Sequence, residues 1–523
     1  MKAPKISALS AKEIDNKFAE QAEQIAALKH QLDWFQRQLF GRKSEKQLID
    51  NPHQTSLFSG ETEQIESTSP TSTEVKAHRR KSNTQRRGDE VNGSGLRFDE
   101  SVPREIIELS LPELKGEQAD DYEIIDYKET SRLALRPGSY VVLTNRRPVV
   151  RHKKQHTVGT VPAPDAVLEG CYADVSVIAG LMVDKAVYYL PLYRQHQRML
   201  DSGITLSRAT LTNWIHKGIE LLRPIYQAQL EHILQSKVLA MDEVPIKAGR
   251  KSKGIMKQTY FWPIYGEQDE IAFTWSTSRG MLHAQQQLTG FTGTLLTDGY
   301  SAYNQATAKL NETDAKIVHA NCWAHTRRYF EKALSAERAD AQQALDLIAK
   351  LYKHEKHLRE QPLCADTALA YRHKHSEPVV NAFFKWAFEQ RQRPELLPSN
   401  PLLKALNYAC EREVELSVFL ANPHVQIDTN HIERALRVTP MGRKNHLFCW
   451  SELGAEQLGM LQSLMVTCRM QGVNPYTYLV DVLQRVALHP DSQVADLLPR
   501  NWKVKFSDHF FTSDLALAGR SNP

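Results

Sequence analysis

Two short apolar segments that each end in an aspartate constrain the fold of this chain most strongly. Residues 238–241 are all apolar and precede Asp242, and residues 293–297 hold two leucines between small side chains and precede Asp298. Short apolar runs of this kind are typical of strands buried in a sheet. We therefore expect both aspartates to stand at the carboxyl ends of strands.

The segments around this pair predict the rest of a sheet. Residues 259–265 and 271–275 are rich in aromatic and β-branched side chains, which favour antiparallel strands paired with the first one. A short helix near 282–289 and a further strand at 317–320 follow. Three antiparallel strands, and then strands alternating with helices, are the order of a ribonuclease-H-like mixed sheet.

The two aspartates and a third acid predict a metal site. In open α/β sheets, ligands bind beyond the carboxyl ends of the strands, and two neighbouring carboxylates repel each other unless a cation lies between them. Oxygen ligands of this kind suit Mg²⁺ or Mn²⁺. The third candidate is Glu433, on a helix that we expect to begin at Thr429 or Asn430. Asp242, Asp298 and Glu433 would then hold two ions.

Each acid also has a simpler interpretation. Asp242 could cap a helix or form a salt bridge at the end of its strand, and Asp298 with Gly299 could form a turn. Asn430 and Glu433 have the spacing of a capping box. It is the ordered set of three acids that favours a catalytic site over three separate structural roles.

A pair of short helices upstream of the sheet has helix-turn-helix spacing. The predicted helices cover residues 190–200 and 208–215, with Gly203 between them and Ser207 as the N-cap of the second. The side chains that the second helix would offer to a DNA groove are Arg208, Thr212 and Asn213. An ordinary helical hairpin has the same pattern.

Basic residues follow the strand that comes after Asp298. Cys322 and His325 have the spacing of half a zinc site, but no second pair lies nearby. We therefore expect Cys322 to pack in the interior. The residues that we expect to face the active site or the DNA backbone are His325, Arg327 and Arg328.

The predicted helix of Glu433 carries further basic residues. Arg434 and Arg437 would share a face with Glu433, because residues three and four apart are neighbours on a helix. Residues 442–446 would form a compact basic loop in which Arg443 and Lys444 clamp a DNA phosphate. A solvated surface turn is the alternative for this loop.

The first 162 residues predict three kinds of structure. Residues 10–48 have apolar side chains at alternating steps of four and three, which indicates a coiled coil that joins copies of the chain. A helix packed on its own domain is the alternative. Residues 49–97 hold few apolar side chains and predict a disordered basic linker, which either contacts DNA phosphates or is only solvated. Residues 98–162 predict a small β-rich domain.

The remaining residues complete a multidomain α/β protein. Between Asp298 and Glu433 most of the sequence has the pattern of amphipathic helices, which predicts an all-helical insertion in the sheet domain. The predicted parts are a helical DNA-binding segment at 163–235, a catalytic domain in two parts at 236–330 and 425–468, the insertion at 331–424 and a C-terminal helical tail at 469–523.

Composition sets the class of protein. Of the 523 residues, 41% are hydrophobic and 24% charged, as in soluble globular proteins. No apolar run approaches the roughly 20 residues that span a bilayer, and the start lacks an apolar signal segment, so we expect a cytoplasmic protein with no membrane partner. The 6 cysteines form no C-x-x-C pair, which argues against a disulfide framework. The net charge of +5 is by itself weak support for a nucleic-acid partner.

Together these motifs resemble insertion-sequence transposases of the IS66 type, and the resemblance covers nearly the whole chain. The matching segments are 37–45, 190–195, 241–243, 297–300, 322–328, 432–437, 442–445 and 472–476. The resemblance implies an Asp-Asp-Glu transposase whose triad is Asp242, Asp298 and Glu433. It also implies small accessory proteins of the same element as partners. Members of this family usually carry a four-cysteine zinc domain, but residues 98–160 contain no cysteine, so we expect no structural zinc.

The function that we expect is that of a DNA transposase of a bacterial insertion sequence. It would bind the ends of the element, hydrolyse phosphodiester bonds with two Mg²⁺ or Mn²⁺ ions and join the 3′-hydroxyl ends to target DNA. Two alternatives stay open: a ribonuclease-H-like nuclease without strand transfer, and an inactive DNA-binding protein derived from a transposase. The three acids argue against the second alternative.

Overall fold

The computed structural model describes residues 173–313, 315–361 and 363–514, together with short pieces among residues 21–29, 140–160 and 166–171. The chain divides into two units, and the elements below all belong to the unit that holds residues 1–42 and 141–523. The predicted linker at 49–97 lies outside the described residues, as does most of the predicted coiled coil and β-rich domain. The described residues of the coiled-coil segment are helical. In the β-rich segment, β1 (Val149–Arg151) pairs antiparallel with β2 (Val158–Thr160).

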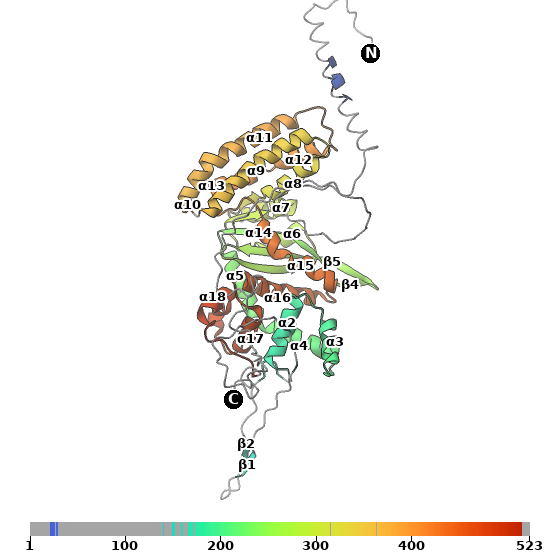
Figure 1. The fold of residues 1–523 in the computed structure, drawn as a ribbon, viewed down its shortest axis with the longest axis vertical. Coiled ribbons are helices and arrows are strands. Elements are labelled where there is room, and N and C mark those ends of the chain that lie inside the picture. Colours follow the sequence, from blue (N-terminus) through green and yellow to red (C-terminus); the bar gives the residue numbers. More distant parts are fainter. Residues whose placement is uncertain are drawn as a thin grey trace, which may run out of the picture. The chain divides into compact units, whose positions relative to one another are not determined.

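A six-stranded mixed sheet forms the centre of the described chain (Figure 1). Its strands are β3 (Val238–Met241), β4 (Val244–Ser252), β5 (Ile255–Gly266), β6 (Glu270–Ser276), β7 (Thr294–Thr297) and β8 (Val318–Asn321). β3 pairs antiparallel with β5 and parallel with β7, and β7 pairs parallel with β8. The short apolar strands predicted from the sequence are therefore confirmed, and β3 and β7 are buried at every position.

The antiparallel part of the sheet differs from the prediction. The sequence predicted β6 as a partner of the first strand, but β6 pairs with β5 instead. β4 was not predicted at all, although it follows β3 almost directly and pairs with the first half of β5. Its core-facing residues are Val244, Ile246 and Ala248, and the polar and charged residues beyond them hide this short alternation. β5 has 12 residues and is long enough to pair with both β3 and β4.

Helices cover the sheet near its parallel strands. α6 (Met281–Gln287) and α7 (Ser301–Asn311) form a core with β3 and β7, in which the rings of Trp262 and Tyr303 meet edge to face at 5.8 Å. α8 (Trp323–Ala333) begins directly after β8. The parallel strands thus alternate with helices, as the sequence predicted.

A layer of helices lies beyond α8, at the top of Figure 1. Its elements are α9 (Arg338–Glu360), α10 (Ala365–Tyr371), the π-helical turn η4 (Arg372–Ser376), α11 (Glu377–Arg391), α12 (Pro401–Cys410) and α13 (Glu413–Ala421). Trp323 joins this layer to α8, because its ring packs on Phe383 at 5.1 Å and its Nε1 donates to the carbonyl of Leu416 at 2.9 Å. The bounds of a separate inserted domain remain a prediction.

A second group of helices precedes the first strand of the sheet in the sequence, and the last of them, α5, contacts β5 and β6. They are α2 (Val175–Ala186), α3 (Leu192–Asp201), α4 (Arg208–Leu221) and α5 (Arg223–Leu234). The predicted N-cap is confirmed, since Ser207 Oγ accepts from the backbone N–H of Thr210 at 3.0 Å. The turn before it is held by His196, whose Nε2 lies 2.7 Å from the carbonyl oxygen of Leu206.

The C-terminal helices tie these parts together. They are α14 (Asn430–Leu436), α15 (Val438–His446), α16 (Glu452–Met470), α17 (Pro475–Arg485), the 3₁₀ turn η5 (Asp491–Leu497) and α18 (Pro499–Lys505). α16 is buried on most sides because it lies between β6 and the helices α2 and α4. Ser463 Oγ accepts from the N–H of Phe273 at 2.8 Å, which fixes α16 on the sheet. Among the described residues, no helix is both long and apolar enough to cross a membrane.

Candidate active site

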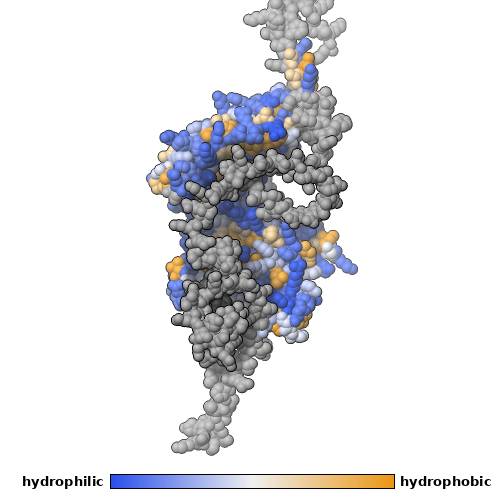
Figure 2. Space-filling view, in the orientation of Figure 1, coloured by the Kyte–Doolittle hydropathy of each residue, from blue (hydrophilic) through white to orange (hydrophobic). Residues whose placement is uncertain are grey.

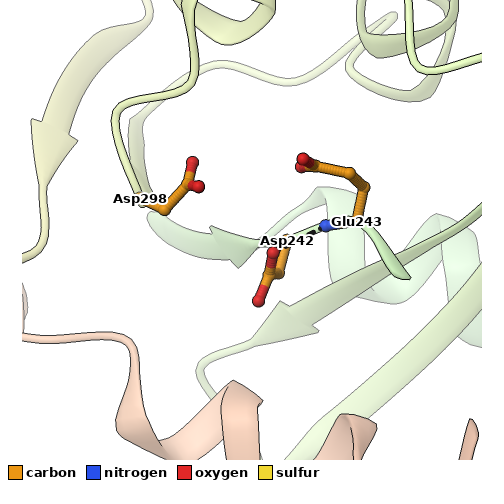
Figure 3. Close-up of side chains that lie close together, drawn as sticks. All are labelled: Asp242, Glu243 and Asp298. Atoms are coloured by element: carbon orange, nitrogen blue, oxygen red, sulfur yellow. Dashed lines mark hydrogen bonds between the residues drawn. The ribbon is translucent and has the colours of Figure 1, made fainter. Parts of the chain in front are cut away.

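Asp242 and Asp298 lie side by side at one edge of the sheet (Figure 3). Asp242 follows the last residue of β3 and Asp298 follows the last residue of β7, and these strands are parallel neighbours in which Ala240 pairs with Leu296. The register therefore carries both aspartates past the same edge. This is the placement that the sequence predicted.

Glu243 joins the two aspartates. Carboxylate oxygens of Asp242, Glu243 and Asp298 all lie within 4.8 Å of one another. The sequence analysis did not select Glu243, which directly follows Asp242. In the structure both side chains approach Asp298, and the N–H of Glu243 donates to Asp242 Oδ1 at 2.8 Å. The adjacency of two acids was the one signal available.

The carboxylate of Glu243 has two further partners. Arg279 forms an ion pair with its Oε1, and the hydroxyl of Tyr303 donates to its Oε2 at 2.9 Å. The guanidinium of Arg279 also lies over the ring of Tyr300, 4.0 Å from its centre. Glu243 is therefore neutralised by the protein itself, whereas Asp242 and Asp298 have no cationic side chain within ion-pair distance among the described residues.

Asp242 and Glu243 lie where burial and the neighbouring carboxylates disfavour their negative charge. Burial raises the pKa of Asp242 to about 8, and the neighbouring carboxylates of Glu243 and Asp298 add to this rise. Burial, followed by the charge of Asp298, also raises the pKa of Glu243. Buried carboxylates in this state are stabilised by a cation. Because every ligand atom offered is a carboxylate oxygen, the group fits a hard divalent ion such as Mg²⁺ or Mn²⁺.

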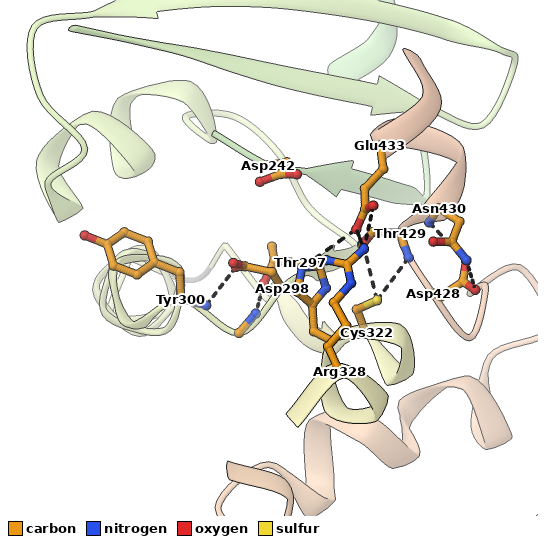
Figure 4. Close-up of polar contacts among 12 residues, drawn as sticks. Asp242, Thr297, Asp298, Tyr300, Cys322, Arg328, Asp428, Thr429, Asn430 and Glu433 are labelled. Atoms are coloured by element: carbon orange, nitrogen blue, oxygen red, sulfur yellow. Dashed lines mark hydrogen bonds and ion pairs between the residues drawn. The ribbon is translucent and has the colours of Figure 1, made fainter. Parts of the chain in front are cut away.

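Glu433 lies near this group on α14, with its carboxylate held by Arg328 (Figure 4). Nη2 of Arg328 lies 2.7 Å from each carboxylate oxygen of Glu433. His325 Nε2 is 3.7 Å from Glu433 Oε1. The charge of Glu433 contributes to the raised pKa of Asp242, although Glu433 is not part of the group of three within 4.8 Å.

The capping-box interpretation of Glu433 does not fit the structure. The helix begins where the sequence predicted, with Thr429 as its N-cap, but the cap makes no side-chain hydrogen bond. The N–H of Asn430 is bound instead by Asp428 Oδ1 at 3.0 Å. The carboxylate of Glu433 is thus free of a local structural role and points to Arg328.

Cys322 holds α8 and α14 together. Its sulfur accepts from both the N–H and the hydroxyl of Thr429 at 3.3 Å, and the next backbone N–H, that of Trp323, donates to the carbonyl of Ile427 at 3.0 Å. Cys322 is fully buried, as predicted. These bonds bring the start of α14 to the end of β8, and they explain how Glu433 reaches the carboxyl edge of the sheet.

The other predicted basic residues are distributed more widely. Arg327 pairs with Glu331 on its own helix at 2.8 Å and contacts none of the acids. Arg434 and Arg437 are exposed on α14 and at its end. On α4, Arg208 and Asn213 are exposed, while the hydroxyl of Thr212 donates to the carbonyl of Arg208 at 2.8 Å.

The predicted basic loop at 442–446 is a helix, and this prediction was wrong. These residues form the last turns of α15, which continues from α14 at Arg437. Gly442 suggested a loop, but here it makes room for a ring: a Cβ at this position would lie 2.6 Å from Cε1 of His446. Arg443 donates to the carbonyl of Pro245 in β4, and Lys444 is exposed.

The fold and the site define an α/β protein with a cluster of acids at the carboxyl edge of a mixed sheet. Residues 170–457, more than half of the chain, match the model of the Transposase IS66 family, and the chain belongs to this family. Residues 463–500 match the IS66 C-terminal element, and residues 27–107 match a segment described as Transposase C of IS166 homeodomain.

Similar proteins occur in Sinorhizobium fredii (strain NBRC 101917 / NGR234). "Uncharacterized protein y4qI" is 29% identical over 414 residues, which are 76% of this chain and 76% of that protein. "Uncharacterized protein y4jD" is 28% identical over 362 residues, 67% of this chain and 70% of that protein. Membership of the family makes this chain a transposase with DNA as its partner.

Proposed function

We propose that this chain cuts and joins DNA as an Asp-Asp-Glu transposase, with Asp242, Asp298 and Glu433 as the triad. The observation that carries the proposal is the placement of Asp242 and Asp298 at the ends of the parallel neighbours β3 and β7. The raised pKa of Asp242 supports it, because a buried carboxylate without a cationic partner calls for a cation.

The sheet supports a ribonuclease-H-like catalytic domain. β4 continues β3 along the same side of β5, so β3 and β4 together count as one strand position. This position, β5 and β6 are then three antiparallel neighbours in the sheet. β7 and β8 follow as parallel strands on the other side of β3. Helices connect the parallel strands. The parallel strands that alternate with helices support such a domain, although the antiparallel pairing differs from the one expected from the sequence.

The residues divide the proposed chemistry among them. Asp242, Asp298 and Glu433 would hold two divalent ions, which when bound supply activation of a water or a 3′-hydroxyl and stabilisation of the leaving oxygen. For Glu433 to act as a ligand, it must exchange its bond to Arg328. Arg328 is then available to bind a phosphate of the DNA, since its planar guanidinium suits phosphate oxygens as well as carboxylate oxygens.

The test is cleavage of labelled DNA that carries the ends of the element, in Mg²⁺ or Mn²⁺. Asp298→Ala should reduce the rate of cleavage by at least a hundredfold while DNA binding stays intact. Asp346→Ala is the matched control, because Asp346 is exposed on α9 and bonds only to Gln342 of the same helix. Cleavage by Asp298→Ala at the wild-type rate would overturn the proposal.

A second arm follows the pre-cut ends. Joining of 3′-hydroxyl ends to a plasmid would support strand transfer, whereas cleavage without joining would indicate a nuclease.

The N-terminal segment 10–48 is proposed to join copies of the chain through a coiled coil. The test compares cross-linking of the full-length protein with cross-linking of a chain that begins after residue 48.

A further inference from the structure

The end of the β4–β5 hairpin carries five cations and no acid. They are Lys247, Arg250, Lys251, Lys253 and Lys257, and we call residues 247–257 the basic hairpin. All five side chains are exposed. No motif that the sequence analysis singled out includes this segment.

Most of this charge is uncompensated. Lys257 pairs with Glu452 at 2.6 Å. The other four cations form no ion pair with any described residue. Like charges concentrated on a narrow hairpin repel one another, and a polyanion relieves this repulsion. The segment is therefore suited to a partner with closely spaced negative charges.

The basic hairpin extends directly from the acid cluster. β4 begins at Val244, the residue after Glu243, so the cations follow Asp242 along one strand. Nine residues of strand span roughly 30 Å, at about 3.3 Å each. One helical turn of duplex DNA is about 34 Å. The hairpin projects beyond the other strands of the sheet in Figure 1.

The base of the hairpin is fixed to the segment that follows α15. The N–H of Cys449 donates to the carbonyl of Lys247 at 2.8 Å, and the N–H of Gly249 donates to the carbonyl of Cys449 at 3.2 Å. Gly249 has φ +72°, and a Cβ there would lie 3.0 Å from Cγ of Glu452. Since α14 and α15 lead into this segment, the cations and Glu433 stand on connected elements.

An exposed aromatic side chain lies next to the hairpin base. Trp450 is 74% exposed, and its ring packs edge to face on Phe448 at 5.1 Å. Leu447, at the end of α15, is 63% exposed. In the view of Figure 2, hydrophobic side chains stand beside the hydrophilic surface in this part of the molecule. Aromatic rings among cations are typical of surfaces that bind nucleic acid.

We propose that the basic hairpin binds the phosphate backbone of the DNA duplex and that Trp450 contacts the same DNA. The contacts would lie within about one helical turn of the phosphate that is cleaved at Asp242 and Asp298. The inference rests on the proposed function and names the surface that holds its substrate. Phosphate contacts fix the position of DNA without reading its sequence. The hairpin therefore positions any duplex, and recognition of the ends of the element belongs to other parts of the chain.

The test is binding of labelled duplex to the full-length protein in EDTA, measured by fluorescence anisotropy over a range of salt concentrations. The variant R250A/K251A/K253A should bind at least tenfold more weakly in about 0.1 M salt. Its plot of log affinity against log salt should be shallower by about 2.7, since each lost phosphate contact removes roughly 0.9 from the slope. The loss should be equal for the end sequence and for a scrambled sequence.

K353A/K374A/K385A is the matched control. It removes three exposed cations from α9, η4 and α11, and the side chains that it replaces form no ion pair with a described residue. An equal loss of affinity in both variants would overturn the proposal, because the effect would then come from net charge alone. The proposal would also be overturned if the hairpin variant aggregates while its monomer binds DNA with unchanged affinity. The cations would then serve to keep the edge strand β4 from pairing with other chains.

Trp450→Ala separates aromatic contact from charge. It should weaken binding about three- to tenfold with no change in the salt slope, whereas unchanged affinity would remove Trp450 from the surface. Failure of this inference is distinguishable from failure of the proposed function. If the wild-type protein cleaves DNA but the hairpin variant binds DNA as tightly as the wild type, the role of the hairpin is rejected. If the hairpin variant loses affinity but the wild-type protein shows no metal-dependent cleavage, the proposed function is rejected.

Discussion

Arg328 binds the carboxylate of Glu433 with one nitrogen, Nη2, that lies 2.7 Å from each carboxylate oxygen. The two residues are 105 positions apart in the sequence and meet because Cys322 joins the start of α8 to the start of α14. The proposed metal ligand Glu433 is thus held by Arg328, the cation that we propose to bind a phosphate. In the structure each side chain is neutralised by the other.

Removal of Arg328 should therefore separate metal binding from catalysis. Arg328→Ala should bind Mn²⁺ about two- to fivefold more tightly, because a partly exposed ion pair that competes with the metal contributes up to about 1 kcal/mol. Cleavage of DNA should fall at the same time. Arg327→Ala is the control, since Arg327 pairs with Glu331 and contacts none of the acids. Free Mn²⁺ is measured by electron paramagnetic resonance, and unchanged affinity in Arg328→Ala would contradict the exchange.

The choice between Glu433 and Glu243 as the third ligand is open to a direct comparison. A ligand that binds only the folded state stabilises it by about 2.7 kcal/mol at a hundred times its dissociation constant. Mn²⁺ should raise the melting temperature of the wild-type protein, and Glu433→Gln should lose most of this rise. Glu243→Gln should keep more of it, because Arg279 and Tyr303 already engage that carboxylate.

The quantity to compare is the rise in melting temperature that Mn²⁺ causes, and not the melting temperature of the metal-free protein. Each substitution also changes the stability of the metal-free protein, so the two variants are compared with and without the ion. A larger loss in Glu243→Gln than in Glu433→Gln would assign the third position to Glu243. Asp298→Asn should abolish the rise in either case.

The sequence predicted the positions of Asp242 and Asp298 because the information is local. Each follows a run of buried residues, and the parallel pairing of two short strands then fixes where their ends meet. Glu433 was found on the strength of family resemblance, and its helix start at Asn430 was predicted from residues nearby. These features need no knowledge of distant contacts.

The features that were missed depend on tertiary contacts. Glu243 joins the acid group although it is the neighbour of Asp242, and the alternation of side chains along a strand does not predict that both carboxylates lie close to Asp298. Residues 442–446 end the helix α15, in which Gly442 leaves room for the ring of His446, and a glycine next to cations in the sequence does not reveal this. β4 pairs with a strand that follows it, and its polar end masked the alternation of its buried part.

His319 should make stability depend on pH. It lies on β8, where Nε2 is 2.8 Å from Oγ1 of Thr297, and burial, with Arg412 nearby, lowers the pKa of His319 to about 4. Below pH 6.5, the ordinary pKa of histidine, His319 binds a proton in the unfolded chain but stays neutral in the folded chain. The free energy of unfolding should therefore fall as the pH drops from about 6.5 to 4, and this loss should end below pH 4.

The measurement compares wild type with His319→Gln. Urea unfolding followed by tryptophan fluorescence at pH 7 and pH 5 should show a smaller loss in the variant, by about 1 kcal/mol after allowance for the partial exposure of the ring. The difference between proteins removes the contributions of His431 and His446, whose pKa values burial also lowers to about 4. Parallel pH profiles for the two proteins would assign the effect to other groups.

We expect Gly299 to help position Asp298 through contacts with residues that follow and end α12. Gly299 has φ +81°, and a Cβ at this position would lie 2.7 Å from Nε of Arg412, whose Nη2 donates to the carbonyl of Gly299 at 3.2 Å. The hydroxyl of Tyr408 donates to the carbonyl of Asp298 in the same loop. Gly299→Ala should therefore cost about 1–3 kcal/mol of stability through backbone strain and displacement of Arg412, and it should move the carboxylate of Asp298.

Gly290→Ala is the matched control for this last variant. Gly290 has φ +85° but open space around its Cβ position, so alanine there carries the backbone strain alone. Both variants should lose stability in urea unfolding, and only Gly299→Ala should lose metal-dependent stabilisation and cleavage. Equal cleavage rates in the two variants would mean that the contact with Arg412 does not position Asp298, and the loop would then owe its shape to β7 alone.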